Sequence, residues 1–193
     1  MAMRMDGSSR FAPGHQWGYF PSVGSAWTIS EEKFFKPLLP VINYAKFRVT
    51  YGTTGNNKVG DFSYLSQYGS VTNSLGYVWN NTNIGGITPY FYGNTDITWE
   101  TTKGVDYGLN IELFKSRVSA EIVYYTKNTT NFLLGVRLPY SAGYPNGANT
   151  QYQNTGDLSN DGLELTINTI NIQKKNFSWT SSFNISFNNA FYI

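Results

Sequence analysis

The chain has 193 residues, of which 13% are charged and 17% are aromatic. Fourteen basic against twelve acidic residues give a net charge of +2 with no basic run, so nothing indicates nucleic-acid binding. The absence of cysteine excludes disulfides and thiolate chemistry, and one histidine, His15, builds no zinc site alone. No apolar run approaches the about 18 residues of a spanning helix, so a membrane role would require strands.

The N-terminal part predicts two strands separated by a helical turn. Residues 19–29 and 46–51 alternate apolar with polar or small side chains, the period of two that places successive residues on opposite faces of a sheet. Between them, residues 30–35 predict a capped helical turn that two prolines soon end. A long connection rich in Gly, Asn, Thr and Tyr follows at residues 53–97.

The longest alternation runs over residues 98–130 and predicts two strands around a turn at residues 114–117. One face of the first strand is mostly apolar, made of Trp99, Thr101, Val105, Tyr107, Leu109, Ile111 and Leu113, with Lys103 as the exception near the strand start. Soluble strands cluster at about 5–6 residues and membrane-spanning strands at about 9–11, so this stretch fits the second class better.

The C-terminal part repeats the arrangement after a second long connection at residues 131–156. Residues 162–168 and 177–188 alternate cleanly around a turn at residues 171–176. We therefore predict an all-β fold, an antiparallel up-and-down meander of about six long strands, with short links at one end and long loops at the other.

Alternation alone does not say whether the apolar face meets a protein core or lipid. A soluble β-sandwich that binds carbohydrate thus stays open. Strand length and aromatic residues near the ends of the apolar stripes favour the membrane. These aromatic residues are Trp27, Tyr51, Trp99, Phe114, Phe177 and Phe187. Six strands close no barrel by themselves, so an incomplete part of a large transmembrane β-barrel is the predicted architecture.

Short motifs in a constant order extend from about Ser8 to Asn188. They include GYFPSVGSAW at 18–27, FRVTYG at 47–52, DITWETT at 96–102, NTG at 154–156 and NDGLE at 160–164. With this order and spacing, the chain resembles the starch-utilisation type C, or RagA-like (SusC/RagA), family of TonB-dependent outer-membrane transporters.

The resemblance implies a barrel of about 22 strands with a plug in its lumen. Residues 1–193 would be a later, partial stretch of that barrel, without signal peptide, TonB-contacting segment or plug, and would stop just after a strand begins near Phe191. The implied function is nutrient import of a glycan or peptide across the outer membrane of a Gram-negative bacterium, not an enzymatic reaction. The implied partners are a SusD-like surface lipoprotein, the TonB complex and outer-membrane lipid. A non-functional product of a truncated gene stays open.

No catalytic residue, metal site or cofactor is predicted, because the carboxylate pairs lack motif spacing. Polar residues of the strands are expected to face the lumen: Glu100, Asp106, Asn110, Glu112, Glu121 and Glu164. Aromatic residues of the long loops are candidates for ligand binding, since flat rings beside amides and hydroxyls suit neutral polar ligands. They are Tyr77, Trp79, Tyr90, Phe91, Tyr92, Tyr140 and Tyr144. Packing of these rings within the loops or against the lipoprotein is the open alternative.

Overall fold

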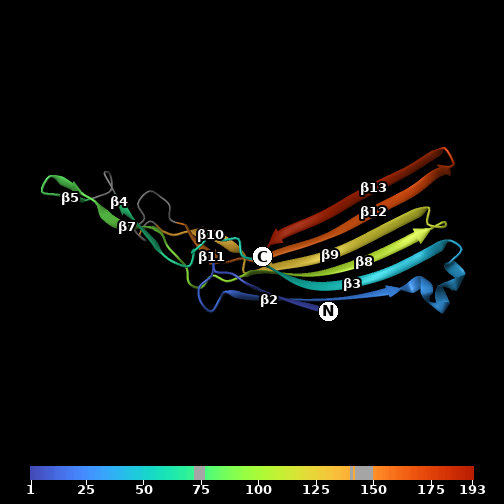
Figure 1. Cartoon of the computed structure of the whole chain (residues 1–193), viewed down its shortest axis with the longest axis horizontal. Helices are drawn as coiled ribbons and strands as arrows, with labels where there is room; N and C mark the ends of the chain where they lie inside the picture. The colour runs from blue at the N-terminus through green and yellow to red at the C-terminus, as the bar shows by residue number, and fades with distance from the viewer. Residues whose placement is uncertain (72–76, 140, 142–149) are drawn as a thin grey trace.

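A seven-stranded antiparallel sheet forms most of the molecule (Figure 1). The computed structural model describes residues 1–71, 77–139, 141 and 150–193. The sheet has the strand order β1-β2-β3-β8-β9-β12-β13, so strands adjacent in the sheet follow one another along the chain except where loop hairpins intervene. Its strands are β1 (Ala2–Gly7), β2 (Trp17–Thr28), β3 (Ile42–Asn56), β8 (Glu100–Leu113), β9 (Val118–Thr130), β12 (Leu158–Lys174) and β13 (Phe177–Tyr192). The all-β, antiparallel prediction is confirmed, and the sheet does not close on itself.

The two ends of the sheet differ. The turn end carries the connections 29–41, 114–117 and 175–176, and the loop end carries 8–16, 57–99 and 131–157. At the turn end, two 3₁₀ helices link β2 to β3: η1 (Ile29–Glu31) and η2 (Lys33–Leu38). At the loop end, three small hairpins extend the long loops: β4 (Gln67–Val71) with β7 (Gly86–Phe91), β5 (Tyr77–Trp79) with β6 (Thr82–Ile84), and β10 (Leu133–Arg137) with β11 (Thr150–Asn154). Figure 1 shows the two ends at opposite sides of the picture.

Several boundaries differ from those predicted from the sequence. Strand β1 was not predicted, and it completes seven strands where about six were expected. Strand β12 continues through a bulge at Ile170/Ile172 into the stretch expected to be a turn. Phe191 lies at the end of β13 and not at the start of a new strand. The bulge lengthens the strand without breaking its pairing, which periodicity alone does not reveal.

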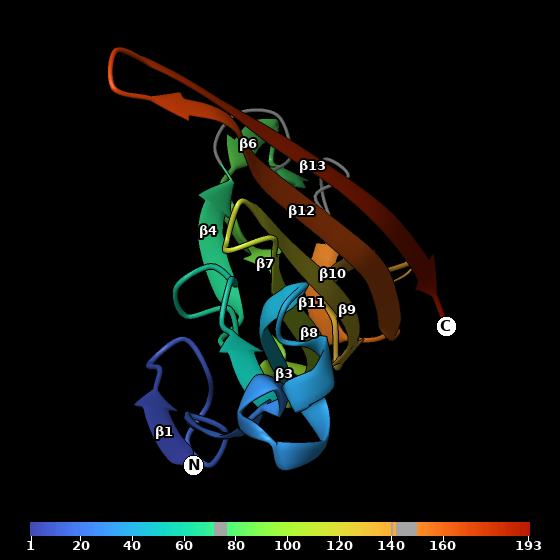
Figure 2. The same cartoon turned by 90° about the vertical axis from the view of Figure 1, so that its right-hand side faces the viewer.

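Pairing register places the apolar residues of successive strands in rows. One row crosses five strands through Val49, Tyr107, Tyr124, Leu163 and Phe187. Directly opposed residues point to the same side of a sheet, so these side chains share one apolar face. Figure 2, which views the sheet from the turn end, shows a twisted layer one strand thick.

The apolar face is open. Tyr107, Tyr124 and Phe187 are 42%, 47% and 60% exposed, although they lie within long, regular strands. The buried hydrophobic cluster lies instead at the loop end, where Phe11 and Ile97 are fully buried and pack with Val59. The chain therefore buries its core beside the sheet's loop end and leaves its main apolar surface uncovered.

No helix in the described part of the chain is both long enough and apolar enough to cross a membrane.

Candidate functional site

The face opposite the apolar rows carries most of the charged side chains of the strands, with Lys103 of β8 and Lys174 of β12 as exceptions. One polar row runs through Lys46, Asn110, Glu121, Thr166 and Asn184. The neighbouring row contains Arg48 on β3 and Glu164 on β12. The alternation of the sequence places both rows on one side, because every second residue of each strand points that way.

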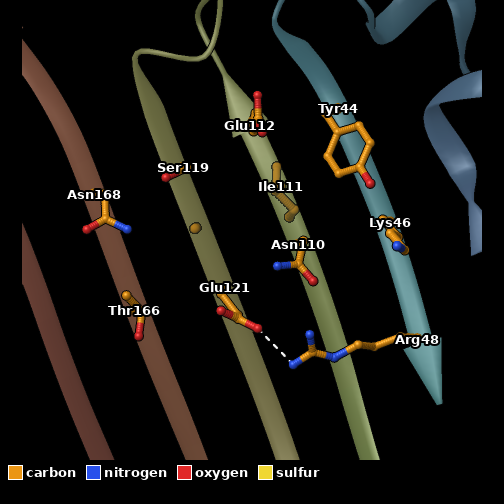
Figure 3. A pocket seen from close by; sticks show the side chains of 11 residues that line it. Tyr44, Lys46, Arg48, Asn110, Ile111, Glu112, Ser119, Glu121, Thr166 and Asn168 are labelled. Carbon is orange, nitrogen blue, oxygen red and sulfur yellow. Dashed lines mark hydrogen bonds and ion pairs between the residues drawn. The ribbon is translucent and has the colours of Figure 1, made fainter. Parts of the chain in front are cut away.

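An ion pair spans three strands of this polar face (Figure 3). Arg48 Nη2 on β3 lies 2.7 Å from Glu121 Oε1 on β9, and β8 runs between them. The guanidinium crosses β8 at Gly108, where an added Cβ atom would clash with Arg48 Nε. Glycine at this position therefore lets the arginine lie flat on the sheet and reach its partner. Both side chains are more than a third exposed, so solvent screens the pair and its net contribution is small.

A second long side chain crosses a glycine in the same way. Tyr125 on β9 passes over Gly162 on β12 and donates its hydroxyl hydrogen to Asn188 Oδ1 on β13, at 3.1 Å. Beside Arg48, Thr50 donates to Asp106 Oδ2 at 3.2 Å. Long side chains thus lie along the polar face instead of projecting away from it, so the relief of this face is shallow.

Two adjoining depressions occupy the polar face, with volumes of about 380 and 430 Å³. Arg48, Glu121 and Thr166 line both. The first also contains Lys46, Asn110 and Glu112, and the second contains Asp106 and Glu164. Hydroxyl, amide and charged groups of both signs face this space, an arrangement suited to hydrogen bonding with a polar partner. Within the described residues, no group of three or more His, Asp or Glu side chains is placed to hold a metal ion.

Five of the six predicted lumen-facing residues line these depressions, and Glu100 does not. The carboxylate of Glu100 is buried at the loop end, where it accepts hydrogen bonds from Asn56 Nδ2 at 3.1 Å and Leu133 N at 3.2 Å. Glu100 therefore joins β3 and β8 to the start of the β10–β11 hairpin. Its alternation matched the polar face, but it lies at the first residue of β8, where the loops cover that face.

Trp99 also lies elsewhere than predicted. It precedes β8 and packs against Phe11 and Phe20, with ring centroids 5.4 and 5.5 Å away. Its indole nitrogen donates to Gln16 O at 3.1 Å. Trp99 is thus part of the loop-end core and not of an aromatic belt on the apolar face.

The structure separates the predicted loop aromatics. Trp79 is 68% exposed at the tip of the β5–β6 hairpin. Phe91 is partly buried, with its ring centroid 6.4 Å from that of Tyr152. Tyr92 is also partly buried. Tyr77 and Tyr90 belong to β5 and β7, and their side chains are not described. Tyr140 and Tyr144 lie outside the described residues. No single aromatic platform is formed by the side chains that are described.

Asparagine and glutamine side chains hold the bases of the long loops together. Asn154 Nδ2 donates to Thr98 O and Asn131 O, while Asn154 Oδ1 accepts from Thr98 N at 2.7 Å. Asn94 Nδ2 donates to Tyr152 O, and Gln151 Nε2 donates to Gly93 O. These residues were not predicted as functional, and the signal that could have found them is their place in or beside the DITWETT and NTG motifs. They fix the loops relative to the sheet.

A long-stranded antiparallel sheet with an open apolar face, a polar face and extended loops at one end is typical of the wall of outer-membrane β-barrels. The family model for TonB dependent receptor-like β-barrels matches residues 1–192. The chain therefore belongs to the TonB-dependent receptor β-barrel family, and the predicted family is confirmed.

Relatives and solved structures agree with this assignment. The chain is 38% identical to TonB-dependent receptor P39 of Formosa agariphila, over 97% of this chain and 17% of that protein. It is 35% identical to the TonB-dependent receptor SusC of Bacteroides thetaiotaomicron, over 96% of this chain and 18% of SusC. The RagAB peptide importer in its closed-closed state superposes with a TM-score of 0.84 at 28% identity, over 98% of this chain and 20% of that one. The chain thus spans about a fifth or less of the length of these relatives.

Proposed function

We propose that the chain is a seven-stranded stretch of the wall of an outer-membrane importer, with its apolar face toward lipid and its polar face toward the lumen. The open apolar face is the observation that carries this proposal. In water, a row of exposed aromatic and aliphatic side chains across five strands would lose the stabilisation that burial provides. In a bilayer the same row is surrounded by the hydrocarbon chains of the lipids.

A soluble β-sandwich is disfavoured by the same face. A sandwich needs a second sheet about 10 Å from the first to cover its apolar side. Among the described residues, the three other sheets are two-stranded hairpins of the long loops, and they extend from the loop end of the main sheet. Sheet packing that would bury Tyr107 or Phe187 is therefore lacking in the described part of the chain.

The proposed cargo is a glycan or peptide, taken up unchanged. Support comes from the family and from RagAB, which is described as a peptide importer. The shallow polar face, with its amides, hydroxyls and mixed charges, is compatible with either cargo. We further propose that the long loops face the exterior, that a SusD-like surface lipoprotein covers them, and that the TonB complex supplies energy to a plug elsewhere in the receptor.

Cysteine labelling tests the two faces directly, since the chain has no native cysteine. Leu109→Cys and Asn110→Cys place thiols on opposite faces of β8, in a full-length receptor that carries this segment and whose other cysteines, if any, are replaced by serine. A water-soluble maleimide applied to outer membranes should modify Asn110→Cys and spare Leu109→Cys. Trp79→Cys, on the exposed hairpin tip, is the positive control, and the unmodified receptor gives the background.

Equal labelling of the two thiols would refute the assignment of the faces. Failure of either variant to reach the membrane is detected separately by the heat-dependent electrophoretic mobility of folded barrels. Val105→Cys and Asp106→Cys then repeat the test one pair further along the same strand.

A further inference from the structure

The turn end of the sheet is strongly basic. It carries six basic residues, Lys33, Lys36, Lys115, Arg117, Lys174 and Lys175, which we name the basic rim. The three turn-end connections contain five of these basic residues and two acidic ones, Glu31 and Glu32, while Lys174 is the last residue of β12. Glu112, near the end of β8, accepts a hydrogen bond from Ser116 of the same end. The loop-end connections, in contrast, contain three basic and three acidic residues. The excess of positive charge is therefore specific to one end of the strands.

The cations of the basic rim are available to a partner. All six residues are exposed, and none of the ion pairs within the described chain includes them. Backbone contacts join the first two connections to each other and to β12: Phe114 N donates to Val41 O at 2.9 Å, and Ile170 N of β12 donates to Arg117 O at 2.7 Å. The 29–41 and 114–117 connections are consequently held together at the edge of the sheet, and Lys174 and Lys175 lie further out at the tip of the β12–β13 hairpin.

Exposed aromatic residues accompany the basic rim. Trp27 and Phe34 pack together, with ring centroids 6.2 Å apart, and Trp27 Nε1 donates to Glu32 Oε1 at 3.0 Å. Phe177 and Trp179 stand at the same end of β13, and Lys174 is directly opposite Phe177 in the register. Each of these four rings is about half exposed or more. Lys174 therefore belongs to the apolar face, at the edge where that face ends.

Aromatic rings beside lysines are the side chains that settle at a membrane surface. Tryptophan and phenylalanine occupy the headgroup boundary, while lysine stems lie along the apolar surface and extend their ammonium groups to the phosphates. We propose, resting on the function proposed above, that the basic rim binds the phosphate groups of anionic phospholipids in the leaflet that borders the turn end. The link of η1 and η2 is then an interfacial element, anchored on the barrel by buried Phe35 and exposing Phe34 and Leu38 to lipid.

The proposed lipid binding by the basic rim predicts a headgroup preference, which the assignment of the two faces does not. Lipid-facing strands require a bilayer but no particular headgroup, whereas six cations outside any ion pair of the described chain prefer anionic over zwitterionic lipid. Each lysine near an anionic surface favours binding by roughly fivefold, and the preference weakens as salt screens it.

Native mass spectrometry of the detergent-extracted full-length receptor measures this preference, with added phosphatidylglycerol or phosphatidylcholine as the probe. The Lys36→Gln/Lys174→Gln variant should bind less phosphatidylglycerol than the unmodified receptor, by a factor of about ten or more. Both proteins should retain the same amount of phosphatidylcholine. The matched control, Lys58→Gln/Arg137→Gln, removes two loop-end charges and should stay within about twofold of the unmodified receptor. Lys174→Gln alone, with an expected loss of roughly fivefold, replaces the double variant if that one fails to assemble.

Equal retention of the two lipids, or equal loss in the two double variants, would overturn the proposal. Binding of lipid A in place of phosphatidylglycerol through the same lysines would also overturn it, because it would assign the rim to the other leaflet. If labelling assigns the faces as proposed and the lipid preference is absent, only the proposed phospholipid binding by the basic rim is refuted. If labelling is equal on both faces, the barrel-wall proposal itself fails.

Discussion

The strand region and the loop end of this molecule are stabilised in different ways. In the strands, hydrogen-bonded ladders order the backbone while most side chains remain partly or fully exposed on both faces. At the loop end, Phe11 and Ile97 are fully buried, and side-chain amides bridge the segments. The loop end therefore resembles the interior of a soluble domain, while the sheet depends on its surroundings.

This difference implies different physical constraints on the two regions of the chain. A strand whose side chains meet lipid or lumen tolerates sequence change as long as the polarity of each face is kept. A loop base that must hold its shape in water needs its own core and satisfied polar groups. The DITWETT and NTG motifs lie at the loop bases, where Asn154 of the second motif is hydrogen-bonded to Thr98 of the first.

A charge on the apolar face should have the largest effect. Leu109 lies between Phe47 and Ile122 in the register, so Leu109→Lys places an ammonium group among apolar neighbours. Near the bilayer midplane this costs about 2–4 kcal/mol, and we expect the full-length receptor to lose most of its membrane-assembled form. Quantitative immunoblots of outer-membrane fractions measure it. Asn110→Lys, one residue along on the polar face, is the control and should assemble normally. Similar loss in both variants would mean that lysine disrupts β8 irrespective of its face.

Removing the centre of the loop-end core should act locally. Ile97 is fully buried, so Ile97→Ala loses about 2–5 kcal/mol of packing. Because the ladders of the sheet do not include Ile97, we expect the barrel to assemble while its long loops become sensitive to protease added outside the cells. Mass spectrometry of the fragments locates the cuts. Ile87→Ala, at a residue that is 81% exposed on β7, should leave the cleavage pattern unchanged. Loss of the whole barrel in Ile97→Ala would show that the two regions fold as one unit.

Loss of one bridging amide should loosen the loop bases less than loss of the core. Asn154→Ala removes three hydrogen bonds, to the amide and carbonyl of Thr98 and to Asn131 O. Leaving such backbone groups without partners costs about 1–3 kcal/mol. Hydrogen exchange of residues 94–99 should accelerate, as measured by mass spectrometry of the assembled receptor. The neighbouring Gln153→Ala, which loses one hydrogen bond to Gln151, should show little change. Unchanged exchange in Asn154→Ala would mean that the apolar core alone holds this segment.

The sequence predicted the parts of the fold that depend on neighbours along the chain. Alternation in residues 98–130 located β8, β9 and the turn between them, and the same period identified which residues share a face. The turn at 114–117 forms with positive φ at Phe114, Lys115 and Ser116. These features follow from local backbone geometry, which a single segment expresses by itself.

Features that depend on register or on distant segments were not predictable. Arg48 and Glu121 are 73 residues apart, and they meet because two strand pairings and Gly108 align them. Trp99 fits the period of the strand, yet Phe11 and Phe20 from other segments draw it into the loop-end core. Strand β1 pairs with the edge of β2, and the alternation of Met3 and Met5 with Arg4 and Asp6 covers too few residues to identify a strand by itself.

The smallest effect is expected for the ion pair across Gly108, and it tests whether the glycine positions that pair. A double-mutant cycle of Arg48→Gln and Glu121→Gln should give a coupling free energy below about 1 kcal/mol, since both side chains are partly exposed. In a Gly108→Ala background the coupling should vanish, because the new methyl group occupies the path of the guanidinium. Gly52→Ala adds a methyl group on the same face at an ordinary distance of 3.8 Å from Ser22 Cβ, so it should leave the coupling intact. Urea unfolding of the receptor in lipid vesicles supplies the free energies. Coupling that persists in the Gly108→Ala background would show that Arg48 reaches Glu121 by another route. The glycine would then not be needed to position the ion pair.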